Sequence, residues 1–310
     1  MASAPAIEGT GLVGCASGWT PSERTRRKVL EPLRRRVLGP LFTRLGYDLL
    51  PAVPEWEHRP LSRREVDRLV RGAAHHIAVD LDAAGIAVPE DMEGLVRAFY
   101  EDICQCPVRQ KHGGNGFNGA LELFVIARAL APDVIIESGV FRGLTTWVLR
   151  KACPEARIFC FDAVFANLQH RDPAATYHEA DWSGYDFDGL DLSRALAFFD
   201  DHIDQARRII EAGERGLSQL VFDDNTAAHR IHAHGGPAFP TVDMVLADDL
   251  PTEPVRWLRN GREFVYEADA SVIEAVRERV ETVRNFDDLH GVTGYSPARL
   301  TYVKLKDRRI

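Results

Sequence analysis

From about residue 118 onward, short apolar runs alternate with segments whose apolar residues recur every three or four positions. The runs VIIES, ARIFCF, ATYHE, RALAFF and LSQLVF predict strands, and segments such as LTTWVLRKAC and IDQARRIIEAGERG predict helices. The apolar runs are too continuous for strands that are buried on one face only. The pattern therefore predicts a doubly wound α/β fold, in which helices cover both faces of a parallel sheet.

Both ends of the chain depart from this alternation. Residues 22 to about 110 predict a series of helices, and apolar residues recur there at four-residue steps from Val29 to Leu45. Near the other end, ETVRNFDDL and ARLTYVKLK predict two strands that form an antiparallel hairpin at the sheet edge. We therefore expect a disordered tail (1–20), a helical N-terminal region (21–112) and a Rossmann-like domain with a sheet of seven strands (113–310).

Composition narrows the class of protein. An apolar share of 45% and a charged share of 27% are ordinary for a soluble globular protein, and a net charge of −8 argues against a general nucleic-acid binder. No apolar run is long enough to span a bilayer, and the N-terminus lacks the basic start of a signal peptide. The five cysteines are odd in number and have no framework spacing, which favours a reducing cytoplasm.

Every predicted strand of the alternating region ends at an acidic residue. In chain order these ends are Glu137, Asp162, Asp181, the pair Asp200-Asp201 and the pair Asp223-Asp224. A single acid in such a place often caps the next helix. In an open parallel sheet, however, ligands bind at the carboxyl ends of the strands. A succession of acidic strand ends therefore predicts a shared polar crevice.

The first of these strands leads into a glycine turn, IIESGVFRGLTT, in which Gly139 and Gly143 are four residues apart. The turn does not fit the nicotinamide motif G-x-G-x-x-G, because Phe141 stands where the second glycine belongs. With an acid two residues before Gly139, it resembles the first motif of class I S-adenosylmethionine-dependent methyltransferases, in the variant of small-molecule and sugar O-methyltransferases. The resemblance runs from about Asn118 to the C-terminus and implies an antiparallel seventh strand. Without it, the two glycines would simply permit a tight turn and close helix packing.

The resemblance implies a site for S-adenosylmethionine. Gly139 and Gly143 would let the backbone approach the methionine part of the cofactor, and Glu137 would hold its amino group from beneath. Asp162 would accept hydrogen bonds from both ribose hydroxyls. The remaining implied contacts are those of Asp181 and Trp182 with adenine, and of Thr145 and Thr146 with the cofactor's carboxylate. The threonines are equally explained as ordinary residues at the start of a helix.

A second constellation is formed by FFDDH and VFDDN, at the ends of strands that are neighbours in this fold. Their candidate metal ligands are Asp200, Asp201, Asp223, Asp224 and Asn225. Carboxylate and amide oxygens suit Mg²⁺ or Ca²⁺ better than zinc, while mutual repulsion relieved by helix N-termini or arginines is the competing reading. The arrangement resembles metal-dependent O-methyltransferases. Catechol and caffeoyl-type members imply the pair Asp224-Asn225, and sugar O-methyltransferases imply Asp223-Asp224.

These features together predict an enzyme that moves a methyl group from S-adenosylmethionine to a hydroxyl of a sugar or secondary metabolite, assisted by Mg²⁺ or another divalent cation. The substrate would be a small molecule or a glycan. A histidine beside the metal ligands can titrate near neutral pH and take the proton of the hydroxyl. His202 is the leading base and His229 the second candidate.

Other readings of the same sequence remain. The histidines of HRIHAH, His229, His232 and His234, could bind iron or zinc in a hydroxylase or hydrolase that kept a methyltransferase-like fold. In a non-catalytic subunit, the glycine turn would bind nothing. The basic helices between Arg24 and Arg44 could rest on an anionic membrane, although a solvated face, or contact with a second subunit in a homo-oligomer, is the more common outcome.

Overall fold

The computed structural model describes residues 30, 32–45, 54–108, 115–225, 239–247, 252–259, 262–298 and 300–306. Within them, one sheet has seven strands in the order β3-β2-β1-β4-β5-β9-β8. The strands are β1 (Val134–Ser138), β2 (Arg157–Asp162), β3 (Thr176–Glu179), β4 (Ala195–Phe199), β5 (Gln219–Phe222), β8 (Val280–Asn285) and β9 (Thr301–Leu305).

The strand directions confirm the predicted Rossmann-like fold class. Strands β1 to β5 pair in parallel, whereas β9 runs antiparallel to both β5 and β8. The predicted C-terminal hairpin is therefore present, with the short helix α10 (His290–Thr293) in its connection. The order of the strands reverses at β1, which pairs with β2 on one side and β4 on the other. Ligands of doubly wound sheets bind at the carboxyl ends beside such a reversal.

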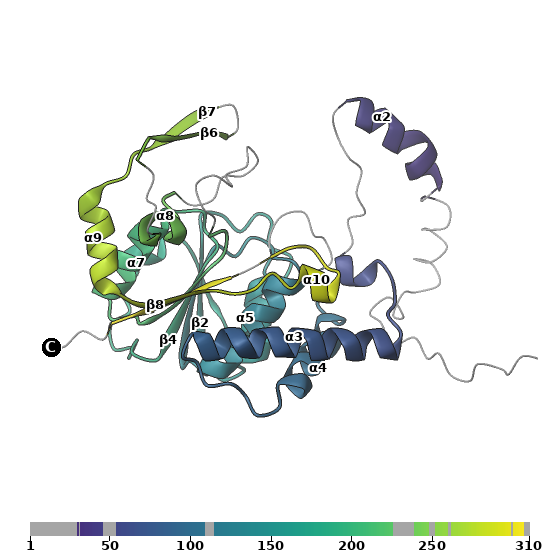
Figure 1. The fold of residues 1–310 in the computed structure, drawn as a ribbon, viewed down its shortest axis with the longest axis horizontal. Coiled ribbons are helices and arrows are strands. Elements are labelled where there is room, and N and C mark those ends of the chain that lie inside the picture. The colour runs from purple at the N-terminus through teal and green to yellow at the C-terminus, as the bar shows by residue number, and fades with distance from the viewer. Residues whose placement is uncertain are drawn as a thin grey trace, which may run out of the picture.

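Helices cover both faces of this sheet (Figure 1). α3 (Arg63–Ala83), α4 (Met92–Ile103), α5 (Phe117–Leu130) and α6 (Leu144–Ala152) share one core, and α7 (Gln205–Glu214), α8 (Val242–Leu246) and α9 (Ala270–Arg279) share the other. Successive residues of a strand point to opposite faces. Accordingly Ile135 packs in the first core, and Val134 and Ile136 pack in the second. This two-sided burial explains why the strands read as continuous apolar runs.

The N-terminal helices are joined to the sheet rather than separate from it. α3 begins with a capping box, in which Ser62 and Glu65 satisfy each other's backbone N–H groups. Near its other end, the buried Asp80 accepts a hydrogen bond of 2.9 Å from Nε of Arg284 in β8. Asp80 also accepts one of 2.8 Å from the backbone N–H of Asp287. The predicted helical region and the sheet therefore share a hydrophobic core and a partly buried ion pair.

Two elements extend beyond this body (Figure 1). The segment with η2 (Arg34–Leu38) and α2 (Gly39–Arg44) exposes apolar side chains such as Leu33, Val37 and Leu41, so its predicted contact with a second subunit or a membrane surface stays a prediction. Strands β6 (Val255–Arg259) and β7 (Arg262–Tyr266) form a separate hairpin that the sequence analysis did not predict. Across the described residues, no helix is both long and apolar enough to span a bilayer.

The cysteines only partly match the expectation of a reducing compartment. Cys106, Cys153 and Cys160 are buried free thiols, and Cys153 and Cys160 lie in the core beneath the sheet. Cys104, at the end of α4, is disulfide-bonded. The disulfide at Cys104 does not match the expected reducing compartment.

Candidate functional site

A cavity of about 470 Å³ lies at the carboxyl ends of the parallel strands, where the order of the sheet reverses. The predicted site residues that line it are Gly139, Asp162, Asp181, Asp200, Asp201, His202, Asp223 and Asp224. Glu137, Gly143, Thr145, Trp182 and Asn225 do not line it. His229 lies outside the described residues, as do His232 and His234. The predicted crevice is therefore present, but several of its expected members belong elsewhere.

The two glycines of the turn are required by the protein's own backbone. Both have positive φ, +92° at Gly139 and +84° at Gly143. A Cβ atom on Gly139 would lie 2.3 Å from the carbonyl oxygen of Asp200, and one on Gly143 would lie 2.3 Å from that of His170. The tight turn and close packing therefore explain both glycines. Gly139 still borders the cavity, so the predicted approach of a ligand applies to this glycine alone.

Asp162, at the end of β2, holds this turn in place. Its Oδ2 accepts hydrogen bonds of 2.9 Å from the N–H groups of Val140 and Phe141, and its Oδ1 accepts one of 3.2 Å from Val164. A carboxylate offers about four acceptor positions. One position remains, which suffices for one ribose hydroxyl and not for the two that the resemblance implies.

Glu137 is buried beneath the turn and bonds only to protein groups among the described residues. Its carboxylate accepts hydrogen bonds of 2.5 Å from Oγ1 of Thr145 and 2.6 Å from Oγ1 of Thr146, and Sγ of Cys160 lies 3.3 Å away. Burial raises the pKa of Glu137 to about 7, although these hydrogen bonds act to lower it. Glu137 and Thr145 thus anchor the start of α6 to β1, and this structural role explains both residues without the implied cofactor contacts.

This buried carboxyl group predicts a pH-dependent stability. A pKa raised from 4.5 to about 7 contributes stability that is complete below pH 4.5 and is lost as the pH rises through 7. Between pH 5 and 8, titration of Glu137 should lower the free energy of unfolding of the parent by about 3 kcal/mol. Glutamine does not titrate, so Glu137→Gln should not show this part of the decrease. Urea denaturation at a series of pH values measures the difference. The exposed Glu155→Gln should follow the parent, and a Glu137→Gln profile parallel to the parent's would contradict the prediction.

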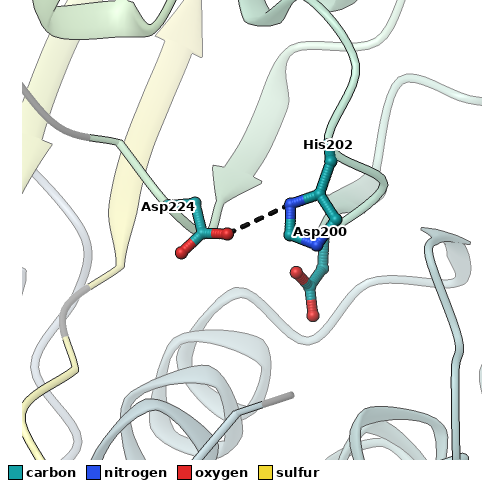
Figure 2. Close-up of side chains that lie close together, drawn as sticks. All are labelled: Asp200, His202 and Asp224. Atoms are coloured by element: carbon teal, nitrogen blue, oxygen red, sulfur yellow. Dashed lines mark ion pairs between the residues drawn. The ribbon is translucent and has the colours of Figure 1, made fainter. Parts of the chain in front are cut away.

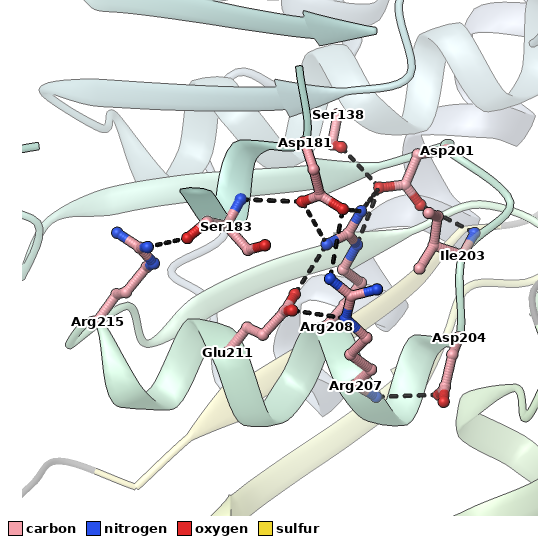
Figure 3. A network of polar contacts seen from close by, with 10 residues as sticks. All are labelled: Ser138, Asp181, Ser183, Asp201, Ile203, Asp204, Arg207, Arg208, Glu211 and Arg215. Atoms are coloured by element: carbon pink, nitrogen blue, oxygen red, sulfur yellow. Dashed lines mark hydrogen bonds and ion pairs between the residues drawn. The ribbon is translucent and has the colours of Figure 1, made fainter. Parts of the chain in front are cut away.

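Arg208 of α7 borders the cavity and links residues that follow two strands, β3 and β4 (Figure 3). Its side chain is 1% exposed. Nε and Nη2 lie 3.0 and 2.8 Å from Oδ2 of Asp201, and Nη1 and Nη2 lie 2.9 and 3.1 Å from the oxygens of Asp181. Nη1 also donates to Glu211 at 2.8 Å, and the hydroxyl of Ser138 donates to Asp201 at 2.6 Å. One buried cation therefore neutralises two of the predicted site acids.

This network corrects the expected contacts with adenine. Burial acts to raise the pKa of Asp181, but the bonds from Arg208 and Ser183 outweigh it and lower the pKa to about 2. The oxygens of Asp181 accept hydrogen bonds from Arg208 and from the backbone N–H of Ser183. Few acceptor positions therefore remain for a hydrogen bond from adenine. Trp182 is fully buried and packs against Phe199, with ring centroids 5.5 Å apart. It is a core residue and cannot wall a ligand in the cavity.

The other half of the cavity gathers Asp200, His202, Asp223 and Asp224 from the ends of β4 and β5. Nδ1 of His202 lies 3.1 Å from Oδ2 of Asp224, and Asp200 lies beside them (Figure 2). Burial, with repulsion from neighbouring acids, raises the pKa of Asp200 well above its usual range. Burial and the neighbouring Asp224 raise that of Asp223 to about 7. These carboxyl groups lie close together, and among the described residues neither has an arginine partner such as the one that neutralises Asp201.

The backbone has an unusual conformation at both His202 and Asp224. His202 has a φ of +54° and Asp224 a φ of +57°. Histidine and aspartate adopt this left-handed conformation more readily than most residues, but it remains sparsely populated. Strained residues that face each other across neighbouring strand ends are more typical of binding and catalytic sites than of the rest of a fold.

Two of the predicted metal ligands are already engaged by other partners. Asp201 is bound by Arg208 and Ser138, so its charge is already matched. Asn225 is buried on the far side of the strand end, where its amide donates to Asp243 and Thr301 at 3.0 and 2.9 Å. Its Oδ1 accepts from the N–H of Asp243 at 2.8 Å. The candidate ligands that remain are Asp200, Asp223 and Asp224, with His202 as base or further ligand.

The sequence analysis missed Arg208, although the chain carries a signal for it. Gln205, Arg208, Ile209 and Ala212 follow the spacing i, i+3, i+4, i+7 and form the buried stripe of α7. An arginine in an apolar stripe needs acidic partners in the interior. The acids at the ends of the neighbouring strands are those partners.

No family model and no curated protein matches the chain. Among solved structures, it is similar to a candidate O-methyltransferase from Klebsiella pneumoniae, with 12% identity, a TM-score of 0.40, and coverage of 88% of this chain and 99% of that one. It is also similar to the O-methyltransferase TomG from Streptomyces achromogenes, involved in tomaymycin synthesis and solved with S-adenosylmethionine (14% identity, TM-score 0.35, coverage 74% and 96%). A third is Podospora anserina methyltransferase PaMTH1 with bound S-adenosylhomocysteine (14% identity, TM-score 0.34, coverage 80% and 98%). Similarity at this level establishes neither a family nor an activity, so function has to be inferred from the site.

Proposed function

We propose that this protein is a class I S-adenosylmethionine-dependent O-methyltransferase that uses a divalent cation and acts on a hydroxyl of a sugar or secondary metabolite. The observation that carries the proposal is that two groups of candidate residues line one cavity, each at its own strand ends. One half has the glycine turn and Asp162. The other has Asp200, Asp223 and Asp224 with His202. A group donor and a metal-bound acceptor need such adjoining places, so that the reacting atoms meet.

The cavity as a whole has the size of a small-molecule site, and the lining of its first half has the chemistry that suits a nucleoside. A volume of about 470 Å³ is within the usual range for small-molecule sites. Phe141, Phe161 and Ala163 provide apolar walls, and the remaining acceptor position of Asp162 suits one ribose hydroxyl. Asp162 would thus bind the nucleoside while it holds the turn closed.

The second half fits a divalent cation. Donor atoms of Asp200, His202 and Asp224 lie within 4.8 Å of one another, and Asp223 borders the same space. The raised pKa values of Asp200 and Asp223 reflect crowded carboxyl groups for which a cation would supply the missing positive charge. Carboxylate donors suit Mg²⁺ or Mn²⁺. We assign Asp200, Asp223 and Asp224 as the holders of the ion.

His202, oriented by Asp224, would accept the proton of the acceptor hydroxyl. A divalent cation, when bound, lowers the pKa of an acceptor hydroxyl and holds the acceptor in place. Oδ2 of Asp224 lies 3.1 Å from Nδ1 of His202 and orients the ring. His202 would then accept the hydroxyl proton at Nε2 as the oxygen attacks the methyl group. The second predicted base, His229, lies outside the described residues and stays a prediction.

Calorimetric titration with S-adenosylhomocysteine tests the cofactor half. We expect the parent to bind and Asp162→Asn to bind roughly 10- to 100-fold more weakly, the usual effect of losing a hydrogen bond to a charged group. Asparagine keeps an oxygen for the N–H groups of Val140 and Phe141, but loses Oδ1, which accepts from Val164 and would face the ribose. The exposed Asp133, at the opposite end of β1, offers Asp133→Asn as the control.

A parent that does not bind S-adenosylhomocysteine would refute the proposed function. Bound iron or zinc after purification, without affinity for the nucleoside, would instead favour the hydroxylase or hydrolase reading. An Asp162→Asn variant that binds like the parent would remove the ribose contact from the proposal and leave the cofactor.

We also propose a cytoplasmic location, on the grounds of the three buried free thiols. The disulfide at Cys104 instead favours an oxidising compartment. Titration of free thiols in protein purified from cytoplasm under alkylating conditions distinguishes a reducing from an oxidising location. The proposed location requires Cys104 to be recovered as a free thiol, and recovery of the disulfide that the structure contains would overturn it.

A further inference from the structure

Two elements that are far apart in the sequence hold most of the large apolar side chains that the described residues expose. Twelve such side chains are exposed, and six of them lie in the segment of η2 and α2. Three more lie in the β6–β7 hairpin, at Leu258, Phe264 and Val265. The remaining three are isolated from one another in the sequence, at Val79, Val88 and Val164. Single apolar residues are normal on a protein surface, whereas grouped ones are typical of an interaction site.

The segment of η2 and α2 has an apolar stripe that the described residues leave uncovered. Its residues follow three- and four-residue steps, the spacing of one helical face, at Leu30, Leu33, Val37, Leu41 and Leu45. Each of these side chains is at least 46% exposed, and α2 has no buried residue. Arg36 and Arg44 are exposed next to the stripe in sequence. A helical segment with an apolar stripe and arginines beside it is suited to lie along an apolar medium with a charged surface.

The β6–β7 hairpin also has an uncovered apolar face. The face with Trp257 is partly covered, because the ring of Phe239 stacks on the indole with ring centroids 4.0 Å apart. Successive residues of a strand point to opposite faces, so Leu258 and Val265 lie on the other face. They are 58% and 45% exposed. The hairpin therefore presents a second apolar surface that no described residue buries.

Both elements extend from the same edge of the sheet (Figure 1). The hairpin is held there through Pro240, whose carbonyl accepts at 3.0 Å from the N–H of Gln205, at the start of α7 just after β4. η3 (Glu55–Glu57), which follows α2 in the chain, is held there because Glu55 accepts at 2.8 Å from the N–H of Phe117. Phe117 begins α5, and α5 leads into the start of β1, so its first residue lies at the opposite, carboxyl edge. The cavity lies at this edge too.

The charge of the two elements is opposite to that of the whole chain. Residues 30–45 contain four arginines and one glutamate, and residues 255–266 contain three arginines and one glutamate, whereas the chain has a net charge of −8. A second copy of the chain could offer negative charge. Outside these two basic elements, however, its described residues expose only isolated apolar side chains. An anionic lipid surface offers an apolar layer and negative charge together.

We propose that the η2–α2 segment and the β6–β7 hairpin together bind the surface of an anionic membrane. Their apolar side chains enter the boundary between headgroups and acyl chains, and their arginines lie beside the lipid phosphates. The carboxyl edge of the sheet, with its cavity, then faces the membrane. The inference is independent of the proposed methyl transfer, because it uses none of the residues that line the cavity.

Cosedimentation with lipid vesicles tests the inference. The parent should bind vesicles in which phosphatidylserine is about one third of the lipid, and bind vesicles of phosphatidylcholine alone about tenfold more weakly or less. Val37→Asp and Leu258→Asp should each weaken binding to the anionic vesicles by about tenfold or more, because each replaces an apolar contact with a negative charge. Both side chains are exposed, so the melting temperature should stay unchanged.

Val79→Asp is the matched control. Val79 is 50% exposed, close to the 55% of Val37, but it belongs to α3, which lies away from both elements (Figure 1). This variant should bind the anionic vesicles like the parent. The inference is overturned if the parent does not bind them, or if Val37→Asp or Leu258→Asp binds them as tightly as the parent.

Sedimentation equilibrium without lipid tests the other occupant of this surface. We expect the parent and Val37→Asp to have the same oligomeric state. A parent dimer that Val37→Asp dissociates would overturn the inference and assign the surface to a second copy of the chain. Both variants should bind S-adenosylhomocysteine like the parent. A parent that binds vesicles but not this nucleoside refutes the proposed function alone, and one that binds only the nucleoside refutes this inference alone.

Discussion

Replacement of Arg208 by methionine is expected to lower the free energy of unfolding by about 3–5 kcal/mol, the usual effect of removing one partner from a buried ion pair. Methionine fills much of the same space but leaves Asp181, Asp201 and Glu211 without their shared cation (Figure 3). Burying carboxylates without a partner is more costly than any packing that the thioether regains. Urea denaturation at neutral pH measures the loss.

The neighbouring Arg207 supplies a matched control. It lies on the same helix and also contacts Asp181 and Glu211, at 3.4 and 2.6 Å, but its side chain is 48% exposed. We expect Arg207→Met to change the stability by less than about 1 kcal/mol, as for other exposed ion pairs. Adding Asp201→Asn to Arg208→Met should recover part of the loss, because one unpaired charge is then removed. If both arginine variants unfold at the same urea concentration, Arg208 is not the hub of the network.

Replacement of Asp224 by asparagine is expected to weaken binding of Mn²⁺ roughly 100-fold or more, since even loss of an outer partner of a metal ligand costs 10- to 100-fold. Asp200→Asn should have a similar effect. Both side chains belong to the cluster with His202 and lack a guanidinium partner among the described residues (Figure 2). Titration followed by the electron paramagnetic resonance of free Mn²⁺ measures the affinity, and S-adenosylhomocysteine should still bind to both variants.

Asp201→Asn is the informative comparison. Asp201 is adjacent to Asp200 in sequence and was an equally strong candidate, but Arg208 already matches its charge. We expect Mn²⁺ affinity within about threefold of the parent's, because a neutralised carboxylate has little to offer a cation. Equal losses at Asp201 and Asp224 would show that the two acids are not divided as we describe. A parent that does not bind Mn²⁺ would remove the metal from the proposed function.

The fold was predictable because it follows from local pattern. Apolar runs in the strands and amphipathic helices between them require a sheet that is covered on both faces, and the structure has that sheet. Parallel strands direct all their carboxyl ends to one edge, so acids that follow the strands gather there. One local signal was overlooked. VRWLR-NG-REFVY has the Asn-Gly pair typical of a two-residue hairpin turn between β6 and β7.

Only the tertiary structure could decide which of those acids pair with an arginine and which face the candidate metal site. Asp200 and Asp201 are adjacent in sequence, yet Asp201 is bound to an arginine that lies seven residues further along, and Asp200 faces Asp224 and His202. Asn225 follows Asp224 directly and points into the buried network around Asp243. Strand pattern brings such residues to one edge of the sheet. The directions in which their side chains leave it depend on loop dihedral angles and on distant partners such as Arg208, which local pattern does not encode.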